Sequence, residues 1–266
     1  MIGAIIGDIV GSRFEFNNHR SKDFELFTAG CFPTDDSIMT VAIGQAIVEC
    51  NGDYSNLSQK AVECMQELGR PYPDCGYGGR FYEWIYTKNP QPYNSFGNGA
   101  AMRVSGAGFA AHTLNEAKEL AYKVTAISHN HPEGIKGAEA VAVAIFLARS
   151  GKTKQEIRQY IEGNYYKIDF TIDGIRAGYR FNETCQQTVP QAFAAFFEGE
   201  SFEDTLRNAI SVGGDSDTLA AIACSIAEAY YGVSDDLRKR AESYLNNDRY
   251  RPVYNWLKNF ESTFGK

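Results

Sequence analysis

The stretch "SVGGDSDTLAAIACSIAEAYYG" (residues 211–232) predicts an apolar, alanine-rich helix that begins at two aspartates. Asp215 and Asp217 stand at its start, and Thr218 follows directly. One acidic residue suits a helix N-terminus, because it accepts hydrogen bonds from free backbone N–H groups and meets the positive end of the helix dipole. Capping does not explain a second carboxylate that leads into a buried helix. The pair therefore indicates a further role for this helix start.

A similar cluster lies near the N-terminus, where Thr34, Asp35 and Asp36 lead into a helical pattern over 36–50. Capping again accounts for one acid and leaves the second unexplained. If the two clusters meet, four carboxylates share one site, and divalent cations would remove their repulsion. All of these donors are hard oxygens, which favours Mg²⁺, Mn²⁺ or Ca²⁺ over zinc. The spacing alone does not bring the clusters together.

Helical patterns dominate the rest of the chain, and no series of alternating segments indicates a sheet. Thr113 with Glu116 and Thr153 with Glu156 have the spacing of capping boxes. We therefore expect an all-α protein with a single domain over residues 1–266. Helices are predicted over 36–50, 58–68, 115–127, 134–149, 202–211, 217–231 and 235–245.

The composition excludes several classes of protein. The net charge of −7 and the lack of a basic stripe argue against a general nucleic-acid-binding surface. The six cysteines form no CxxC pair, so we expect reduced thiols, no zinc ribbon and a cytoplasmic protein. Asp8 interrupts the apolar N-terminal run, which argues against a signal peptide or a membrane span.

Two glycine-rich stretches separate the helical patterns, "PDCGYGGRF" (73–81) and "NSFGNGAAMRVSG" (94–106). Glycine permits tight turns and also lets the backbone approach a ligand closely. Both interpretations stay open from composition alone.

Seven stretches, in family order along nearly the whole chain, resemble the ADP-ribosylglycohydrolase family, the helical hydrolases related to dinitrogenase-reductase-activating glycohydrolase. The resemblance implies a compact all-α domain with a dinuclear centre of two divalent cations, Mg²⁺ or Mn²⁺. It also implies that the two acidic clusters are neighbours. The stretches are "GAIIGDIVGSRFE" (3–15), "TDDS" (34–37), "GYGG" (76–79), "SFGNGAAMRVSG" (95–106), "SHNHPEG" (128–134), "TVPQA" (188–192) and "GGDSDTLAAIA" (213–223).

The same resemblance implies roles for individual residues. Glu15 matches a glutamate that some members place at the metal centre, and either it or a metal-site aspartate such as Asp36 would act on the attacking water. Asp8 would fix a loop through backbone hydrogen bonds. The implied metal ligands are Thr34, Asp35, Asp36, Asp215, Asp217 and Thr218. The implied substrate-binding residues are Gly76, Tyr77, Gly78, Ser95, Phe96, Gly97, Asn98, Gly99 and His129.

The expected activity is hydrolysis of the glycosidic bond at ribose C1″ of an ADP-ribosylated target, with release of ADP-ribose. The target is a protein, a nucleic acid or a small molecule, and the aglycone stays open. We expect backbone N–H groups of the glycine-rich segment to hold the diphosphate without Lys or Arg. Alternatives are a dinuclear phosphohydrolase that cleaves the diphosphate and a non-catalytic ADP-ribose-binding protein.

Overall fold

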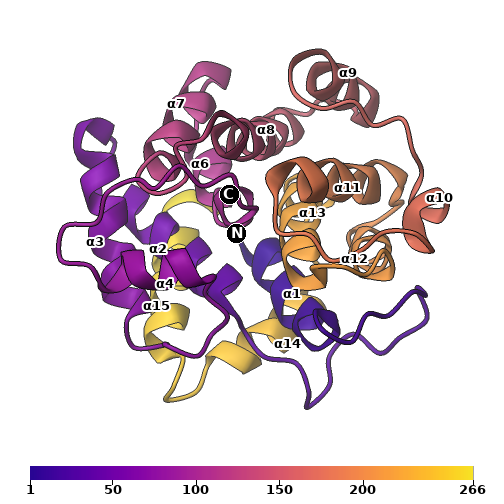
Figure 1. Ribbon diagram of the computed structural model, residues 1–266, viewed down its shortest axis with the longest axis horizontal. Coiled ribbons are helices and arrows are strands. Elements are labelled where there is room, and N and C mark those ends of the chain that lie inside the picture. Colours follow the sequence, from indigo (N-terminus) through magenta and orange to yellow (C-terminus); the bar gives the residue numbers. More distant parts are fainter. Residues whose placement is uncertain (266) are drawn as a thin grey trace.

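The computed structural model describes residues 1–265, and over this range the chain forms α-helices and two short 3-10 helices but no β-strand (Figure 1). The all-α prediction is confirmed. Lys266, the last residue of the predicted domain, lies outside the described residues. The elements are α1 (Ile2–Gly11), η1 (Ser12–Phe14), α2 (Asp35–Glu49), η2 (Tyr54–Asn56), α3 (Leu57–Gly69), α4 (Gly79–Tyr86), α5 (Gly99–Met102), α6 (Ser105–Ala110), α7 (Leu114–Thr125), α8 (Pro132–Arg149), α9 (Lys154–Asn164), α10 (Ile172–Arg176), α11 (Cys185–Glu198), α12 (Phe202–Ser211), α13 (Ser216–Tyr231), α14 (Asp235–Leu245) and α15 (Arg251–Phe264).

Two helices from opposite ends of the chain, α1 and α13, pack side by side at the centre of the molecule (Figure 1). All ten residues of α1 are buried. Its glycines at positions 3, 7 and 11 face α13, where a Cβ atom on Gly7 would lie 2.3 Å from the backbone oxygen of Ala220. Because no side chain separates the two backbones here, α1 and α13 approach more closely than ordinary helix pairs.

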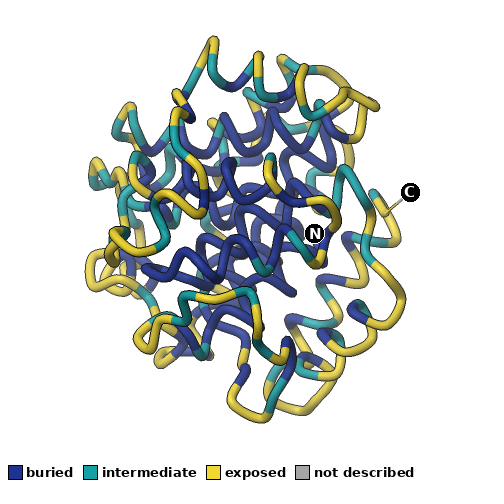
Figure 2. Tube along the Cα trace, turned by 90° about the vertical axis from the view of Figure 1, so that its right-hand side faces the viewer, coloured by how far each residue is buried: buried dark blue, intermediate teal, exposed yellow. Residues whose placement is uncertain are grey.

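Burial decreases from the central helices to the outer ones (Figure 2). The helices α2, α8 and α13 are buried over most of their circumference. The C-terminal helix α15 instead buries one face, formed by Val253, Leu257 and Phe260. Their spacing of four and three residues gives the apolar stripe of a helix that packs on a core from outside.

Several helices were not predicted from the sequence. They include α1, whose three glycines disfavour a helix in isolation, and α11, which contains Pro190. The second glycine-rich stretch is helical in its C-terminal part, since α5 and α6 cover most of residues 99–106. Tertiary burial stabilises these helices against their local propensity.

The predicted helix starts agree in part with the structure. Thr153 and Glu156 form a complete capping box. Thr113 caps α7, but Glu116 accepts a hydrogen bond from the backbone N–H of His112 instead of closing the box. All six cysteines are free, as predicted. Among the helices of residues 1–265, none has the length and hydropathy of a membrane span.

Candidate active site

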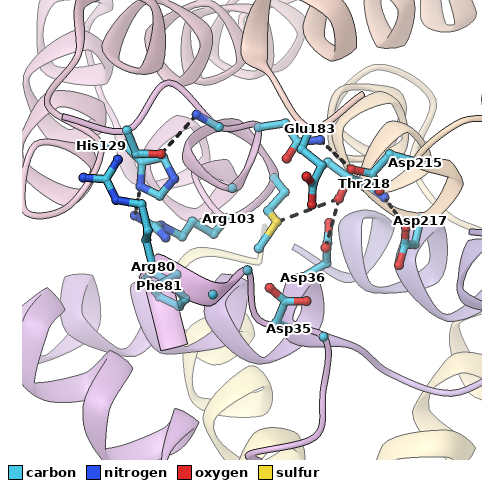
Figure 3. Close-up of a pocket in the computed structure, with 18 of the residues that line it drawn as sticks. Asp35, Asp36, Arg80, Phe81, Arg103, His129, Glu183, Asp215, Asp217 and Thr218 are labelled. Atoms are coloured by element: carbon cyan, nitrogen blue, oxygen red, sulfur yellow. Dashed lines mark hydrogen bonds between the residues drawn. The ribbon is translucent and has the colours of Figure 1, made fainter. Parts of the chain in front are cut away.

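A cavity of about 290 Å³ opens where the N-terminal ends of α2, α4 and α13 converge (Figure 3). One end of the cavity carries carboxylates, and the other end carries arginine, histidine and aromatic side chains. Of the predicted site residues, the cavity wall includes Glu15, Asp35, Asp36, Gly76, Gly78, Ser95, Gly97, Asn98, Gly99, His129, Asp215, Asp217 and Thr218.

Asp8 holds the first acidic cluster in place from the buried helix α1. Its Oδ2 accepts hydrogen bonds from the backbone N–H groups of Thr34 (2.9 Å) and Ser37 (3.0 Å). Its Oδ1 accepts one from Thr34 Oγ1 at 2.7 Å. The predicted role of Asp8 as a fixing residue is confirmed, with the start of α2 as the segment that it fixes. Because Thr34 also caps α2 by accepting from Asp36 N at 3.2 Å, its hydroxyl is engaged within the protein.

The second cluster depends on a reversal of the chain just before α13. Gly213 and Gly214 both have φ near +70° (+73° and +72°), a conformation that other residues rarely adopt. The side chain of Asn18 stabilises this turn, since it donates to Gly214 O (2.9 Å) and accepts from Gly214 N (2.7 Å). Asn18 also donates to the backbone oxygen of Glu15 at 2.9 Å. A residue that sequence reasoning missed therefore joins the Glu15 segment to the start of α13.

The two acidic clusters meet in the cavity. Thr218 Oγ1 donates a hydrogen bond to Asp36 Oδ2 at 3.1 Å. Glu15, Asp215 and Asp217 each offer an oxygen atom, and these three atoms lie within 4.8 Å of one another. The juxtaposition that the family resemblance implied is therefore present in the fold.

The carboxylate end of the cavity favours the binding of positive charge. Burial, with the other carboxylates as a further cause, raises the pKa values of Asp35, Asp36 and Asp217 well above their usual range. Burial and the charges of Asp215, Asp8 and Glu183 raise the pKa of Glu15 to about 7. Asp36 Oδ1 is buried and has no hydrogen-bond partner among residues 1–265. An unpaired buried oxygen among crowded carboxylates fits a divalent cation, because a cation offsets both the repulsion and the lost hydration.

Asn98 connects the glycine-rich segment to the second acidic cluster. Its Nδ2 donates to Asp215 Oδ2 at 2.7 Å and to Thr188 Oγ1 at 3.1 Å. The backbone of the same segment forms an isolated bridge between Gly97 and Thr184. Asn98 thus orients a carboxylate of the acidic end while it lines the cavity.

Three predicted site residues do not line the cavity, and their functional roles stay predictions. Thr34 directs its hydroxyl to Asp8 and to the backbone of α2. Tyr77 donates its hydroxyl proton to the backbone oxygen of Gly69 at 3.1 Å. The ring of Phe96 is 43% exposed and packs 5.1 Å from the ring of His131.

The structure adds cationic residues that the sequence analysis passed over. Arg80 and Arg103 both line the cavity at the end opposite the carboxylates (Figure 3). The expectation that backbone N–H groups of the glycine-rich segment hold the diphosphate without Lys or Arg stays a prediction, although two arginines line the same cavity. Neither arginine belongs to a motif that gives its side chain a role, and the burial of Arg103 depends on packing that spacing does not reveal.

The arrangement agrees with comparisons to known proteins. A sequence model of the family described as "ADP-ribosylglycohydrolase" matches residues 1–259. The chain belongs to the ADP-ribosylglycohydrolase family. The predicted resemblance is confirmed, and this family assignment makes the protein a hydrolase of glycosidic bonds.

Individual relatives of this ADP-ribosylglycohydrolase family member have low sequence identity, but they align with most of the chain. The chain is 24% identical to an ADP-ribosylhydrolase ARH3 from Bos taurus, over 93% of this chain and 89% of that protein. It is 26% identical to the ADP-ribosylarginine hydrolase Tri1 from Pseudomonas putida, over 88% of this chain and 70% of that protein. A solved "ADP-ribosylglycohydrolase-related protein complex" has the same fold, with a TM-score of 0.71 and 20% identity over 98% of this chain and 95% of that one.

Proposed function

We propose that the protein is a divalent-cation-dependent ADP-ribosylhydrolase that cleaves the bond between ribose C1″ and its target and releases ADP-ribose. The observation that carries this proposal is the two-ended cavity. Its carboxylates fit cations at one end, and its arginine and histidine side chains fit a diphosphate at the other (Figure 3). A ribose between the two ends would present C1″ to the acidic end.

The residues that would hold two Mg²⁺ or Mn²⁺ ions are the ligands expected from the sequence, with the carboxylates of Asp35, Asp36, Asp215 and Asp217 at the cavity wall. When bound, such cations supply Lewis acidity that orients ribose hydroxyls and acidifies water. The four negative charges of the ionised aspartates equal the four positive charges of two divalent cations. The hard oxygen donors and the unpaired Asp36 Oδ1 support this assignment.

Within this proposal, Glu15 acts on the attacking water. Its carboxylate lies beside Asp215 and Asp217, and it is half-buried at the cavity wall. As water attacks C1″, the bond to the aglycone breaks with its electron pair on the aglycone, and the water proton passes to Glu15. Asp36 is the second candidate for this proton transfer, because its Oδ1 has no hydrogen-bond partner in the described part of the chain.

The relatives bear on the aglycone without deciding it. The Pseudomonas putida relative is named for ADP-ribosylarginine. The acidic cavity mouth of this chain, which Glu15 and Glu183 flank, would accept a cationic guanidinium. Serine-linked and base-linked ADP-ribose are the substrates to compare with it.

The test is a chromatographic assay of products from an ADP-ribosyl-arginine peptide, an ADP-ribosyl-serine peptide and ADP-ribosylated DNA, with Mn²⁺ or with chelator. We expect free ADP-ribose from one substrate, only when the cation is present. Asp36→Asn should abolish the release, and Asp74→Asn, an exposed aspartate outside the cavity, should leave it unchanged. Release of AMP and a ribose phosphate would contradict the proposal, because it would place the cleavage at the diphosphate.

A further inference from the structure

Phe16 is the most exposed large hydrophobic side chain of residues 1–265, with 85% of its surface accessible to water. Its ring stacks on that of Phe181, which is 41% exposed. The ring centres lie 5.9 Å apart, and the ring planes are inclined by 25°. Aromatic side chains stabilise a protein mainly through the apolar surface that they bury. Phe16 keeps most of its surface in water, and the stack with Phe181 alone does not explain this exposure.

The aromatic pair, Phe16 with Phe181, lies beside the acidic end of the cavity. Phe16 directly follows Glu15, and Phe181 precedes Glu183 by two residues. Both glutamates line the cavity, Glu183 at its acidic end (Figure 3), whereas neither phenylalanine lines it. Two residues of extended chain span about 7 Å. A polypeptide with one residue held at the acidic end would therefore reach the aromatic pair within one or two further residues.

The backbone on both sides of the aromatic pair is anchored to the rest of the protein. Arg20, in the segment that follows the first phenylalanine, donates a hydrogen bond to the backbone oxygen of Tyr179 at 2.7 Å. The backbone oxygen of Glu183 accepts one from the backbone N–H of Asn98, also at 2.7 Å. Because the two segments are tied together and to the cavity wall, a partner of the aromatic pair would bind without first ordering them.

The charges near the aromatic pair favour a cationic partner. Glu183 is exposed and forms no ion pair within residues 1–265. Arg180, the basic residue nearest to it in sequence, donates to the backbone oxygens of Ala177 (3.2 Å) and Tyr179 (3.1 Å). Aromatic faces attract Lys and Arg side chains, and a nearby carboxylate adds to this attraction. The net charge of −7 opposes the approach of nucleic acid.

We propose that Phe16, Phe181 and Glu183 form a docking surface for a basic polypeptide target, on which a Lys or Arg side chain one or two residues from the ADP-ribosylated residue packs against the rings. The inference rests on the proposed function for the ADP-ribosyl group and adds the class of target that carries it. The rings supply apolar contact and attraction for the cation, and Glu183 supplies the opposite charge. The polypeptide is thus recognised outside the cavity that holds the ADP-ribosyl group.

The competing interpretation is that the stacked rings only join two surface segments. A joining role predicts that Phe16→Ala lowers the stability of the protein and affects all ligands equally. A docking role predicts an effect on ligands that extend beyond ADP-ribose, and it predicts that the effect depends on the charge of the extension.

The first test compares two peptides that carry ADP-ribose through a non-hydrolysable linkage, one with lysine and one with glutamate beside the modified residue. We expect the intact protein to bind the lysine peptide about 5- to 30-fold more tightly, as measured by the dissociation constants. Phe16→Ala combined with Phe181→Ala should remove most of this difference. Tyr122→Ala, at a tyrosine that is 55% exposed outside the cavity, should keep it. Equal binding of the two peptides by the intact protein, or a difference that survives the double substitution, would overturn the proposal.

A second test does not depend on the phenylalanine variants. Glu183→Gln should reduce the preference for the lysine peptide, and Glu183→Lys should reverse it, because the charge beside the rings is first removed and then inverted. An unchanged preference in both variants would contradict the proposal. An ADP-ribosylated oligonucleotide that binds the intact protein more tightly than the lysine peptide would also contradict it, because the surface would then serve nucleic acid.

These measurements also separate the docking surface from the proposed function. A protein that prefers the lysine peptide through its two phenylalanines but releases no ADP-ribose would support the surface and reject the hydrolase activity. Cation-dependent release of ADP-ribose at equal rates from hydrolysable forms of both peptides would support the hydrolase activity and reject the surface.

Discussion

Thr218 Oγ1 donates a hydrogen bond to Asp36 Oδ2, and this bond joins two helix starts that are 182 residues apart in sequence. The helices α2 and α13 thereby direct their N-terminal ends at one cavity. The positive ends of the helix dipoles stabilise ionised carboxylates, but they do not offset the mutual repulsion of four of them. Repulsion among the crowded carboxylates destabilises the metal-free protein. Bound cations would remove this repulsion, so its relief would strengthen cation binding.

Asp217→Asn is expected to have opposite effects in the absence and presence of metal. The pKa of Asp217 is raised well above its usual range by burial and by Asp215, Asp36, Glu15 and Asp8, so removing its charge relieves repulsion. The melting temperature of the metal-free protein should rise, by about 2–4 °C for each kcal/mol relieved. The further rise produced by Mn²⁺ should be lost. Thermal melts with chelator and with Mn²⁺ check this, and a variant that is less stable than the parent in both conditions would contradict it.

The stability of the metal-free protein should fall as the pH rises from about 4 to about 7. Burial raises the pKa of Asp8 to about 6, and burial with neighbouring charges raises that of Glu15 to about 7. The unfolded chain ionises these groups at lower pH, so the folded state binds more protons within this window and loses stability as they leave.

Urea unfolding at several pH values, with chelator and with Mn²⁺, measures this effect. Saturating Mn²⁺ should remove most of the decline, because the cation replaces the protons on the carboxylates. Asp217→Asn should also reduce it, since one repulsive charge is gone. The free energy of unfolding of the metal-free protein could instead stay constant with pH, in the parent and in Asp217→Asn alike. That result would show that the carboxylates are not coupled.

Glu15→Gln should slow hydrolysis and preserve ligand binding. Gln retains the size of Glu but cannot accept the water proton, and loss of a general base reduces turnover by about 10²- to 10⁴-fold. The Kd of ADP-ribose should change by much less. Turnover and equilibrium binding of the same preparation provide the comparison. Parallel losses in both would assign Glu15 a binding role, and an unchanged turnover would remove it from the reaction.

Gly7→Ala should destabilise the fold by about 3 kcal/mol or more, because a rigid backbone blocks the added methyl group. Its Cβ would lie 2.3 Å from the backbone oxygen of Ala220 and 2.6 Å from the backbone nitrogen of Ala221. The matched control is Gly163→Ala in α9, where no atom of residues 1–265 outside the neighbouring helix backbone lies within 4 Å of the added Cβ. Chemical unfolding should show a small gain in stability for the control, of about 0.5–1 kcal/mol. Similar effects of the two substitutions would argue against the close packing of α1 and α13.

The acidic half of the site could be predicted from the sequence, because paired carboxylates at a helix start are unusual. Asp36 and Asp217 are buried acids at helix starts, a position where a second carboxylate requires an explanation. Their proximity came from the family resemblance, because no local rule relates helix starts that are far apart in sequence. Asp8 was predicted to fix a loop, and its hydrogen bonds indeed serve the backbone and hydroxyls of the α2 start.

The cationic half of the site and the central helix pair could not be predicted in the same way. Arginine is exposed in most proteins, so the burial of Arg103 follows only from the complete fold. Likewise, Gly3, Gly7 and Gly11 indicate poor helix propensity until α13 is placed against them. Asn18 contributes through its contact with Gly214, which depends on a turn that forms far along the chain.

The measurement that tests the account most directly is the release of ADP-ribose by the chelator-treated protein as Mn²⁺ is titrated back. The account predicts no release without cations and an activity that saturates as the acidic cluster binds two ions per chain. The same titration of Asp217→Asn should give no comparable activity. Full release in the presence of chelator would contradict the central claim that Asp36, Asp217 and their neighbours hold the cations on which hydrolysis depends.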